Sequence, residues 1–377
     1  MQIVAGIYIH IPFCRKACNY CNFHFSTSLK VVDQMVHAIC TELMQRKLEL
    51  LNTPIETIYF GGGTPSLLNQ NHLLQIFETI ESNFNLRDIK EITLEANPED
   101  ITTESLETWK KLNFDRLSIG VQSLNEAELT FMNRNHNAIQ SKAAIELAIN
   151  ANFKNITIDY IYGSPWKTDE DWKSELNWAL NSGITHLSAY ALTVEPKTQL
   201  ANQINKNILP PPTDESMESQ FNILQEYISK NGWEAYEISN YCKPEHRAVH
   251  NSNYWAGKPY LGVGPSAHSF DGQNSRRWNV SNNALYIKGI ENGTVYWENE
   301  VLTFENKFNE YLMTKLRTKE GIDLNYIESI NPNWKKNQSK NIINLSLKGN
   351  ITVSNNALCL SNSGKLISDY IISLLMI

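Results

Sequence analysis

Three cysteines lie close together near the start of the chain. Cys14, Cys18 and Cys21 are half of the six cysteines in 377 residues, and six is far too few for a disulfide-built scaffold. Clustered thiols instead indicate metal or redox chemistry. Two metal sites are compatible with them: a structural zinc ion with His24 as its fourth ligand, or an iron–sulfur cubane, normally held by four cysteines, in which one iron keeps an open position. Three ordinary buried cysteines are the remaining alternative.

A second set of residues that could do chemistry follows the apolar segments of the first half of the chain. Its members are Gly62, Gly63, Thr64, Glu95, Gln122 and Asp159. Taken singly, the glycines could serve a tight turn and each polar residue could cap a helix. Taken together, two carboxylates and an amide could bind ribose hydroxyls and an ammonium group. The planar fork of Arg134 could pair with a carboxylate of the same ligand.

Parallel strands would bring these residues together. Six β-rich segments are predicted as strands, at residues 6–13, 55–60, 91–96, 116–121, 155–162 and 186–194. Amphipathic segments predict helices at residues 31–51, 70–84, 103–112, 141–152 and 169–181. This alternation predicts an α/β fold with a parallel sheet, either doubly wound or a full or partial barrel, whose ligands bind at the C-terminal strand ends. The strands are nearly apolar on both faces, as buried parallel strands usually are.

The rest of the chain has a different pattern. A helix at 215–230 and a strand at 233–238 could form one more βα-like unit. Residues 241–300 are rich in Asn, Gly and aromatic residues and have no long periodic element. A helix at 308–316, a hairpin within 349–360 and a final apolar helix predict a small α+β module. We therefore expect a core at 1–240, a connecting segment at 241–300 and a C-terminal module at 301–377.

The cysteine spacing, three residues and then two with an aromatic residue before the last cysteine, resembles that of radical S-adenosylmethionine (radical SAM) proteins. The other motifs resemble the coproporphyrinogen-oxidase-like branch of that family, which implies a partial TIM-like barrel with a winged-helix-like C-terminal module. The resemblance also implies a 4Fe-4S cluster on Cys14, Cys18 and Cys21, which donates an electron to the sulfonium of S-adenosylmethionine. The residues it assigns to S-adenosylmethionine are Gly62, Gly63, Thr64, Glu95, Gln122, Arg134, Asp159 and Ala191. Those it assigns to the surroundings of the cluster are Tyr8 and Tyr20.

Two further features choose between members of this branch. Position 23 is Phe23, where the oxygen-independent coproporphyrinogen III oxidases carry a fourth cysteine. The segment His250-Asn-Ser-Asn-Tyr254-Trp255 has the H-N-x-x-Y-W pattern of the radical SAM haem chaperones, the HemW family. A histidine in such a segment could equally be structural. The resemblance implies that His250 contacts haem, since imidazole is a common axial ligand and aromatic rings suit a porphyrin face.

The resemblance therefore predicts a haem chaperone that carries a 4Fe-4S cluster and S-adenosylmethionine and passes haem to an acceptor protein, for instance a respiratory one. It predicts no coproporphyrinogen oxidase activity, and family members are often homodimers. The alternative is an oxygen-independent coproporphyrinogen III oxidase. His268 has no assigned role and is expected to be structural.

Composition narrows the class of protein. The formal net charge is −7, whereas a general nucleic-acid binder usually has a basic excess. No apolar run reaches the roughly 18 residues that a membrane-spanning helix needs. The first residues lack the basic region of a signal peptide. These features predict a cytoplasmic protein that binds no nucleic acid and has no integral membrane segment.

Overall fold

The fold is described by a computed structural model that covers residues 3–50 and 53–377. Its centre is a row of six parallel strands in chain order. These strands are β1 (Ala5–Ile11), β2 (Ile55–Gly62), β3 (Glu91–Ala96), β4 (Arg116–Gln122), β5 (Asn155–Tyr162) and β6 (His186–Ala191). The helices between them are α1 (Val32–Arg46), α2 (Gln70–Asn83), α3 (Thr103–Lys111), α4 (Glu126–Phe131), α5 (Ala138–Asn150) and α6 (Asp169–Asn181). The predicted α/β alternation and parallel sheet are confirmed.

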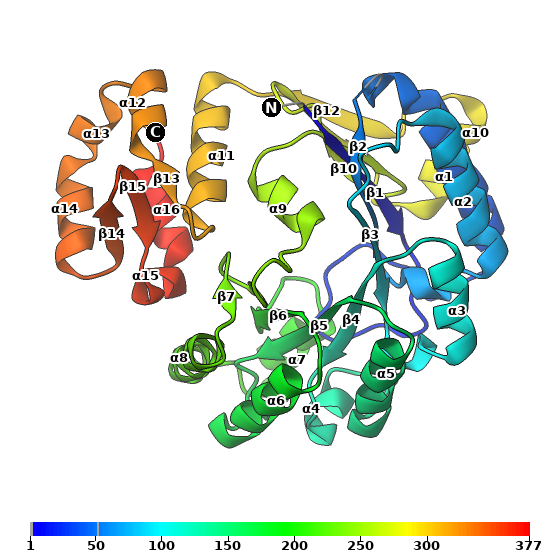
Figure 1. Ribbon diagram of the computed structural model, residues 1–377, viewed down its shortest axis with the longest axis horizontal. Coiled ribbons are helices and arrows are strands. Elements are labelled where there is room, and N and C mark those ends of the chain that lie inside the picture. Colours follow the sequence, from blue (N-terminus) through cyan, green and yellow to red (C-terminus); the bar gives the residue numbers. More distant parts are fainter. Residues whose placement is uncertain (1–2, 51–52) are drawn as a thin grey trace.

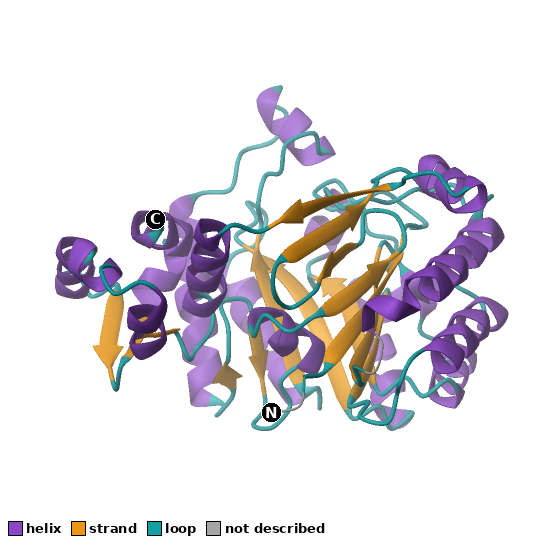
Figure 2. Cartoon of the chain, turned by 90° about the horizontal axis from the view of Figure 1, so that it is seen from above, coloured by secondary structure: helices purple, strands orange, loops and turns teal. Residues whose placement is uncertain are grey.

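The helices cover the outer face of a strongly curved sheet, which forms a partial barrel (Figures 1 and 2). Along β1, Ile7 and Ile9 are fully buried in the core that includes Ile39 of α1. The alternate residues, Tyr8 and His10, line a cavity inside the barrel. The prediction that the strands are apolar on both faces is therefore wrong for the inner face. The reason is that this interior is a chamber for polar contacts, not a core packed with side chains.

Four strands that the sequence did not predict extend the sheet on the far side of β1. They are β9 (Tyr260–Val263), β10 (His268–Phe270), β11 (Ser275–Asn279) and β12 (Trp297–Val301). β9 pairs with β1 in parallel, and the other three follow in antiparallel order. Two helices, α9 (Val249–Trp255) and α10 (Asn283–Asn292), lie in the same part of the chain. Residues 260–301 therefore build a wall of the same sheet as the N-terminal half.

The other edge of the sheet also differs from expectation. After α7 (Gln199–Asn205) and α8 (Asp214–Lys230), the chain forms the short strands β7 (Glu234–Ala235) and β8 (Asn240–Cys242). β8 pairs with β6, and β7 with β8, in antiparallel orientation. The prediction of another parallel βα-like unit with a strand at 233–238 is therefore wrong. The segment is too short to cross back over the sheet, so it folds as an antiparallel edge.

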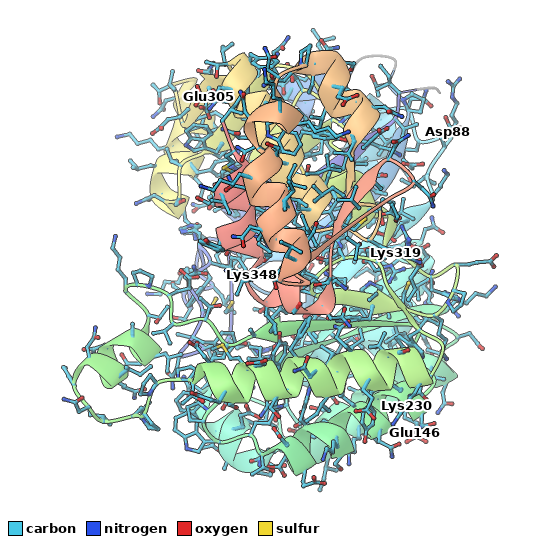
Figure 3. All side chains as sticks on the ribbon, turned by 90° about the vertical axis from the view of Figure 1, so that its left-hand side faces the viewer. Asp88, Glu146, Lys230, Glu305, Lys319 and Lys348 are labelled. Carbon is cyan, nitrogen blue, oxygen red and sulfur yellow. The ribbon has the colours of Figure 1, made fainter. Side chains whose placement is uncertain are left out.

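The C-terminal module has a hydrophobic core of its own, which includes Phe308, Trp334, Leu358 and Ile371. Its helices are α11 (Phe304–Leu316), α12 (Leu324–Ile330), α13 (Trp334–Asn337), α14 (Ser339–Leu347), α15 (Asn362–Leu366) and α16 (Ser368–Leu375). Its antiparallel strands are β13 (Ile322–Asp323), β14 (Ile351–Ser354) and β15 (Ala357–Leu360), and β14 and β15 confirm the predicted hairpin. Figure 3 shows the module above α8, which α15 contacts. In the described ranges, no helix combines the length and the apolar character of a membrane span.

Candidate functional site

A cavity of about 1520 Å³ occupies the inside of the barrel. Every residue that the sequence singled out for a site lies on its wall. These residues are Tyr8, Cys14, Cys18, Tyr20, Cys21, Gly62, Gly63, Thr64, Glu95, Gln122, Arg134, Asp159, Ala191 and His250. The volume exceeds the roughly 300–1,000 Å³ of a typical site for one small molecule. The cavity therefore has room for more than one ligand.

The three cysteines lie on a loop that follows β1 at its C-terminal end. The loop is held to the helix α4 region because Asn19 donates its backbone N–H to the carbonyl of Met132 (3.2 Å). The hydroxyl of Thr64 lies 3.5 Å from the sulfur of Cys14. Burial raises the pKa of Cys14 to about 11 and also raises that of Cys21. Without a metal these groups stay protonated, and metal binding would displace the protons.

The donor set fits an iron–sulfur cubane better than a zinc ion. In residues 3–50 and 53–377, no three or more His, Cys, Asp or Glu side chains converge as one ion would require. The proposed fourth zinc ligand, His24, instead lies 2.7 Å through Nε2 from the amide oxygen of Asn283. A cubane does not need such convergence, because each thiolate binds a different iron at the cluster's corners. Three cysteines and no fourth ligand leave one iron open.

The glycines after β2 are required by close packing against the chain that leads to the cysteines. Gly62 has a φ of +111°, and a Cβ atom there would lie 2.7 Å from the ring of His10. A Cβ atom on Gly63 would lie 2.6 Å from the carbonyl oxygen of Phe13. The Gly62 N–H also donates to a carboxylate oxygen of Glu95 (3.1 Å). Side chains at these two positions would push the cysteine loop out of place.

Two carboxylates face the inside of the barrel from β3 and β5. Glu95 accepts a hydrogen bond from the hydroxyl of Tyr59 (2.7 Å), and Asp159 accepts one from Ser118 (2.9 Å). Burial raises the pKa of Glu95 to about 7 and that of Asp159 to about 6. A buried carboxylate stabilises a neighbouring positive charge strongly. This part of the cavity therefore suits a ligand with a cationic group and hydroxyls.

Arg134 joins the carboxylate region to the cysteines. Its Nη1 donates to the sulfur of Cys18 (3.3 Å), and its Nη2 donates to Asn97 Oδ1 (2.5 Å) and to the carbonyl of Gly120 (2.7 Å). Its Nε is buried without a hydrogen-bond partner among the described residues. A buried donor without a partner is costly, and a ligand carboxylate would satisfy it.

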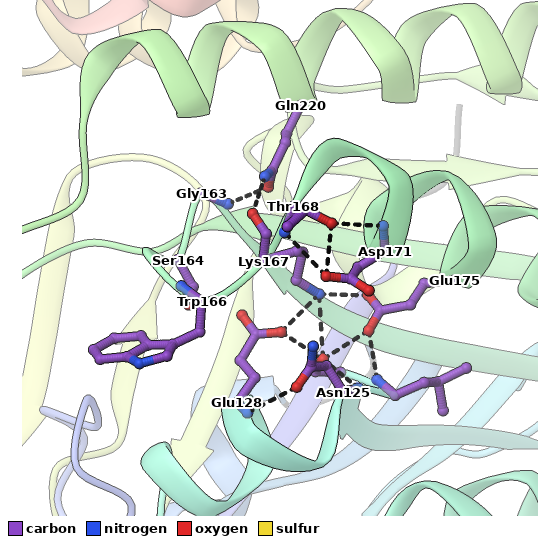
Figure 4. Close-up of polar contacts among 12 residues, drawn as sticks. Asn125, Glu128, Gly163, Ser164, Trp166, Lys167, Thr168, Asp171, Glu175 and Gln220 are labelled. Atoms are coloured by element: carbon purple, nitrogen blue, oxygen red, sulfur yellow. Dashed lines mark hydrogen bonds and ion pairs between the residues drawn. The ribbon is translucent and has the colours of Figure 1, made fainter.

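A buried ionic cluster anchors the end of β4 behind the cavity (Figure 4). The ammonium group of Lys167 pairs with Glu128 (3.1 Å) and Glu175, and all three side chains are buried. The hydroxyl of Ser123 donates to both carboxylates. Ser123 follows Gln122 in the chain, and α4, which carries Glu128, leads directly to Arg134. The cluster therefore fixes the positions of two residues on the cavity wall.

His250 lies at the opposite end of the barrel from the cysteines. The backbone N–H groups of Val249 and His250 donate to the carboxylate of Glu91 (2.7 and 3.0 Å), and Asn253 donates to Glu56 (2.8 Å). Glu56 and Glu91 are at the N-terminal ends of β2 and β3. Helix α9 therefore closes the floor of the barrel, a position that the sequence did not indicate.

The imidazole of His250 faces the cavity from this floor. Its Nδ1 lies 2.8 Å from the hydroxyl of Thr57, and its ring stacks near Tyr59 and Tyr8, at centroid distances of 5.0 and 6.5 Å. Burial lowers its pKa to about 4, so the ring is neutral at pH 7. In the described chain, Nε2 has no hydrogen-bond partner, and it remains available to a ligand.

Several cavity residues were missed in the sequence. Thr57, Tyr59, Asn97 and Ser118 all line the cavity and contact a predicted site residue. Three of them lie at strand positions, or directly after a strand, two residues from another wall residue. The period of two along a strand was the signal that could have found them. The assumption that both faces of the strands are packed concealed it.

Comparisons with known proteins agree with this geometry. A model described as the radical SAM superfamily matches residues 8–179. The heme chaperone HemW of Bacillus subtilis is 31% identical over 366 residues, covering 96% of both chains. HemW of Mycobacterium tuberculosis is 32% identical over 324 residues, covering 85% of this chain and 83% of its own. This chain belongs to the HemW family of radical SAM proteins.

The fold has a solved counterpart. The structure of coproporphyrinogen III oxidase from Escherichia coli matches with a TM-score of 0.86 at 22% identity, over 100% of this chain and 90% of the oxidase. At that identity the match supports the partial-barrel fold alone. Membership of the radical SAM superfamily implies a 4Fe-4S cluster and S-adenosylmethionine as cofactors. The cysteine loop and the carboxylate region of this HemW family member fit these two groups.

Proposed function

We propose that this protein is a haem chaperone, which binds haem in the barrel and transfers it to an acceptor protein. The observation that carries the proposal is a neutral imidazole, His250, with a free Nε2 inside the cavity that also contains the cysteines. Haem iron binds a neutral imidazole nitrogen. The other ring nitrogen of a ligating histidine usually holds a hydrogen bond that fixes the ring, and Thr57 is in place for this contact. The rings of Tyr8 and Tyr59 offer apolar surfaces for a porphyrin.

The same proposal assigns the two cofactors to the upper part of the cavity. Cys14, Cys18 and Cys21 would bind the cluster, with Tyr8 and Tyr20 beside it. The residues proposed for S-adenosylmethionine are Gly62, Gly63, Thr64, Glu95, Gln122, Arg134, Asp159 and Ala191. When bound, the pair supplies one-electron chemistry on the sulfonium group. The chain's own residues orient the ligand: Arg134 would pair with its carboxylate, while Glu95 and Asp159 would accept hydrogen bonds and stabilise its positive charge.

The proposal also includes the setting in which the protein works. The expected division is a core at 1–240, a connecting segment at 241–300 and a winged-helix-like module at 301–377. We propose a cytoplasmic protein, which forms homodimers and delivers haem to a protein such as a respiratory enzyme. No nucleic-acid partner is proposed.

An oxygen-independent coproporphyrinogen III oxidase is the second candidate, because the E. coli oxidase has the same fold over the whole chain. One observation argues against it. Phe23, at the position of the oxidases' fourth cysteine, is 69% exposed and lines the cavity. The phenyl ring offers no thiol at that place.

Paired assays on one anaerobically reconstituted sample test both functions. The wild-type protein is expected to bind haem with a shift of the Soret band, and His250→Ala to bind at least tenfold more weakly. His72→Ala is a suitable control, because His72 lies on α2 and pairs with Asp33 on the surface, away from the cavity. Equal titrations of wild type and His250→Ala would contradict the assignment. Formation of protoporphyrinogen from coproporphyrinogen III, S-adenosylmethionine and a reductant would favour the oxidase instead.

A further inference from the structure

A row of paired residues crosses four strands of the sheet, starting beside His250. Gly6 on β1 pairs with Tyr260 on β9, Tyr260 pairs with Phe270 on β10, and Phe270 pairs with Arg276 on β11. Paired residues on neighbouring strands place their side chains on the same face of a sheet. A Cβ atom on Gly6 would lie 3.2 Å from the imidazole of His250. The row therefore begins at His250 and runs along the cavity face.

The row ends in a positive charge at a defined reach. Neighbouring strands are about 4.8 Å apart, so Phe270 lies about 10 Å from Gly6. The guanidinium of Arg276 leans back over the Phe270 ring, with 4.6 Å between its Cζ atom and the ring centroid. The charge is thus about two strand spacings away from the histidine. Tyr260 and Arg276 both line the cavity, as His250 does.

Aromatic rings border the space between the two ends. Tyr254 of α9 lies near Tyr260, with 5.9 Å between ring centroids, and both residues line the cavity. Gly6 has no side chain to obstruct the space next to His250. The result is a slot with an imidazole at one end, aromatic rings along it and a guanidinium at the other end.

Arg276 has unused hydrogen-bonding capacity. Its Nε and Nη2 donate to the two carboxylate oxygens of Glu310 on α11, at 2.8 Å each. No hydrogen bond to Nη1 forms within the described chain, so one edge of the guanidinium is available. Lys258, the neighbouring cation on the wall, differs because its ammonium already pairs with Glu56 (2.7 Å). Arg276 is therefore the residue of the slot best able to receive an anion.

We propose that Arg276 binds a carboxylate of the tetrapyrrole whose metal is ligated by His250, a propionate in the case of haem. The inference rests on the proposed function. A porphyrin carries its carboxylates on short arms at the ring edge, one macrocycle radius and an arm from the metal, as Arg276 lies from His250. Glu310 is the positioning residue, because it holds the other edge of the guanidinium. The C-terminal module thereby contributes to the specificity of the barrel.

The test compares haem with its dimethyl ester, in which both carboxylates are blocked. The wild-type protein is expected to bind haem roughly tenfold or more tightly than the ester, as for hydrogen bonds to charged groups. Arg276→Gln should bind the two ligands equally, at about the affinity of wild type for the ester. Arg276→Lys, which keeps the charge without the fork, should retain part of the preference and covers the case that the glutamine variant does not fold.

Two controls and one reference separate the explanations. Arg277→Gln removes a charge from the same strand on the opposite face, where Arg277 packs on Trp297 (4.3 Å), and should behave as wild type. Glu310→Gln should retain part of the preference, because the guanidinium remains. Retention of the full preference in Arg276→Gln, or its complete loss in Glu310→Gln as well, would overturn the direct contact. Loss of both ligands only in His250→Ala supports the proposed function, whereas failure of the wild type to bind either ligand would refute that function itself.

Discussion

The Nδ1 atom of His250 lies 2.8 Å from the hydroxyl of Thr57, on the floor of a cavity whose other end carries three cysteines. If Nδ1 donates its proton to Thr57, Nε2 keeps its lone pair for a metal. Thr57→Val removes the acceptor with little change in volume. We expect its haem affinity to fall about tenfold, as for other residues that orient metal-binding histidines. Thr57→Ser should restore the wild-type affinity, and an unchanged titration for Thr57→Val would contradict this role.

The pH dependence of haem binding follows from the burial of His250. Burial lowers its pKa to about 4, and only the neutral ring binds iron. Protons therefore compete for the ring only as the pH falls toward 4. An ordinary histidine with a pKa near 6.5 would lose about tenfold in affinity by pH 5.5. We expect the difference in haem affinity between wild type and His250→Ala to be the same at pH 7.5 and 5.5. A tenfold decrease would show that the ring is more exposed.

Iron and sulfide analysis tests the cysteine loop. Cys14→Ala, Cys18→Ala and Cys21→Ala should each lose most iron and acid-labile sulfide after anaerobic reconstitution, because each thiolate binds a separate iron. Cys359→Ala should keep both, since Cys359 lies in the C-terminal module and contacts the carbonyls of Lys319 and Glu320. Zinc without sulfide in the wild-type protein would support the structural zinc site instead.

Loss of the buried ammonium of Lys167 should destabilise the whole core. Lys167→Met leaves Glu128 and Glu175 buried without their counter-charge, which typically costs about 3–5 kcal/mol in the free energy of unfolding. Lys173→Met on the surface of α6 should cost less than about 1 kcal/mol. Urea unfolding measures both. Adding Glu128→Gln and Glu175→Gln to Lys167→Met should recover part of the loss, and a loss below about 1 kcal/mol for Lys167→Met alone would contradict the argument.

Local sequence patterns were sufficient for the parallel half of the fold. Strand and helix periodicity identified the alternation from β1 to β6, and the C-terminal strand ends located Glu95, Gln122 and Asp159 on one wall. These inferences depend only on neighbouring residues and on the rule that parallel strands present their C-terminal ends together. Contacts of this kind can be deduced without knowing the rest of the structure.

Long-range contacts could not be deduced in the same way. Strands β9 to β11 have only three to five residues each, too few for a period to stand out. The place of α9 depends on carboxylates of Glu56 and Glu91 far away in the sequence. For this reason His250 was recognised by its motif, while its position on the floor was not. The same is true of Arg276, whose relation to His250 exists only through strand pairing.

The pairing of β1 with β9 also affects how the protein can be made. Gly6 and Tyr260 are 254 residues apart (260 − 6), so β1 leaves the ribosome long before its second neighbour exists. Until then β1 is an edge strand with the apolar residues Ile7, Ile9 and Ile11, and such edges invite wrong pairing with other chains. A nascent chain that stalls before residue 260 therefore exposes a site for aggregation. Only completion of β9 both protects that edge and gives His250 its wall.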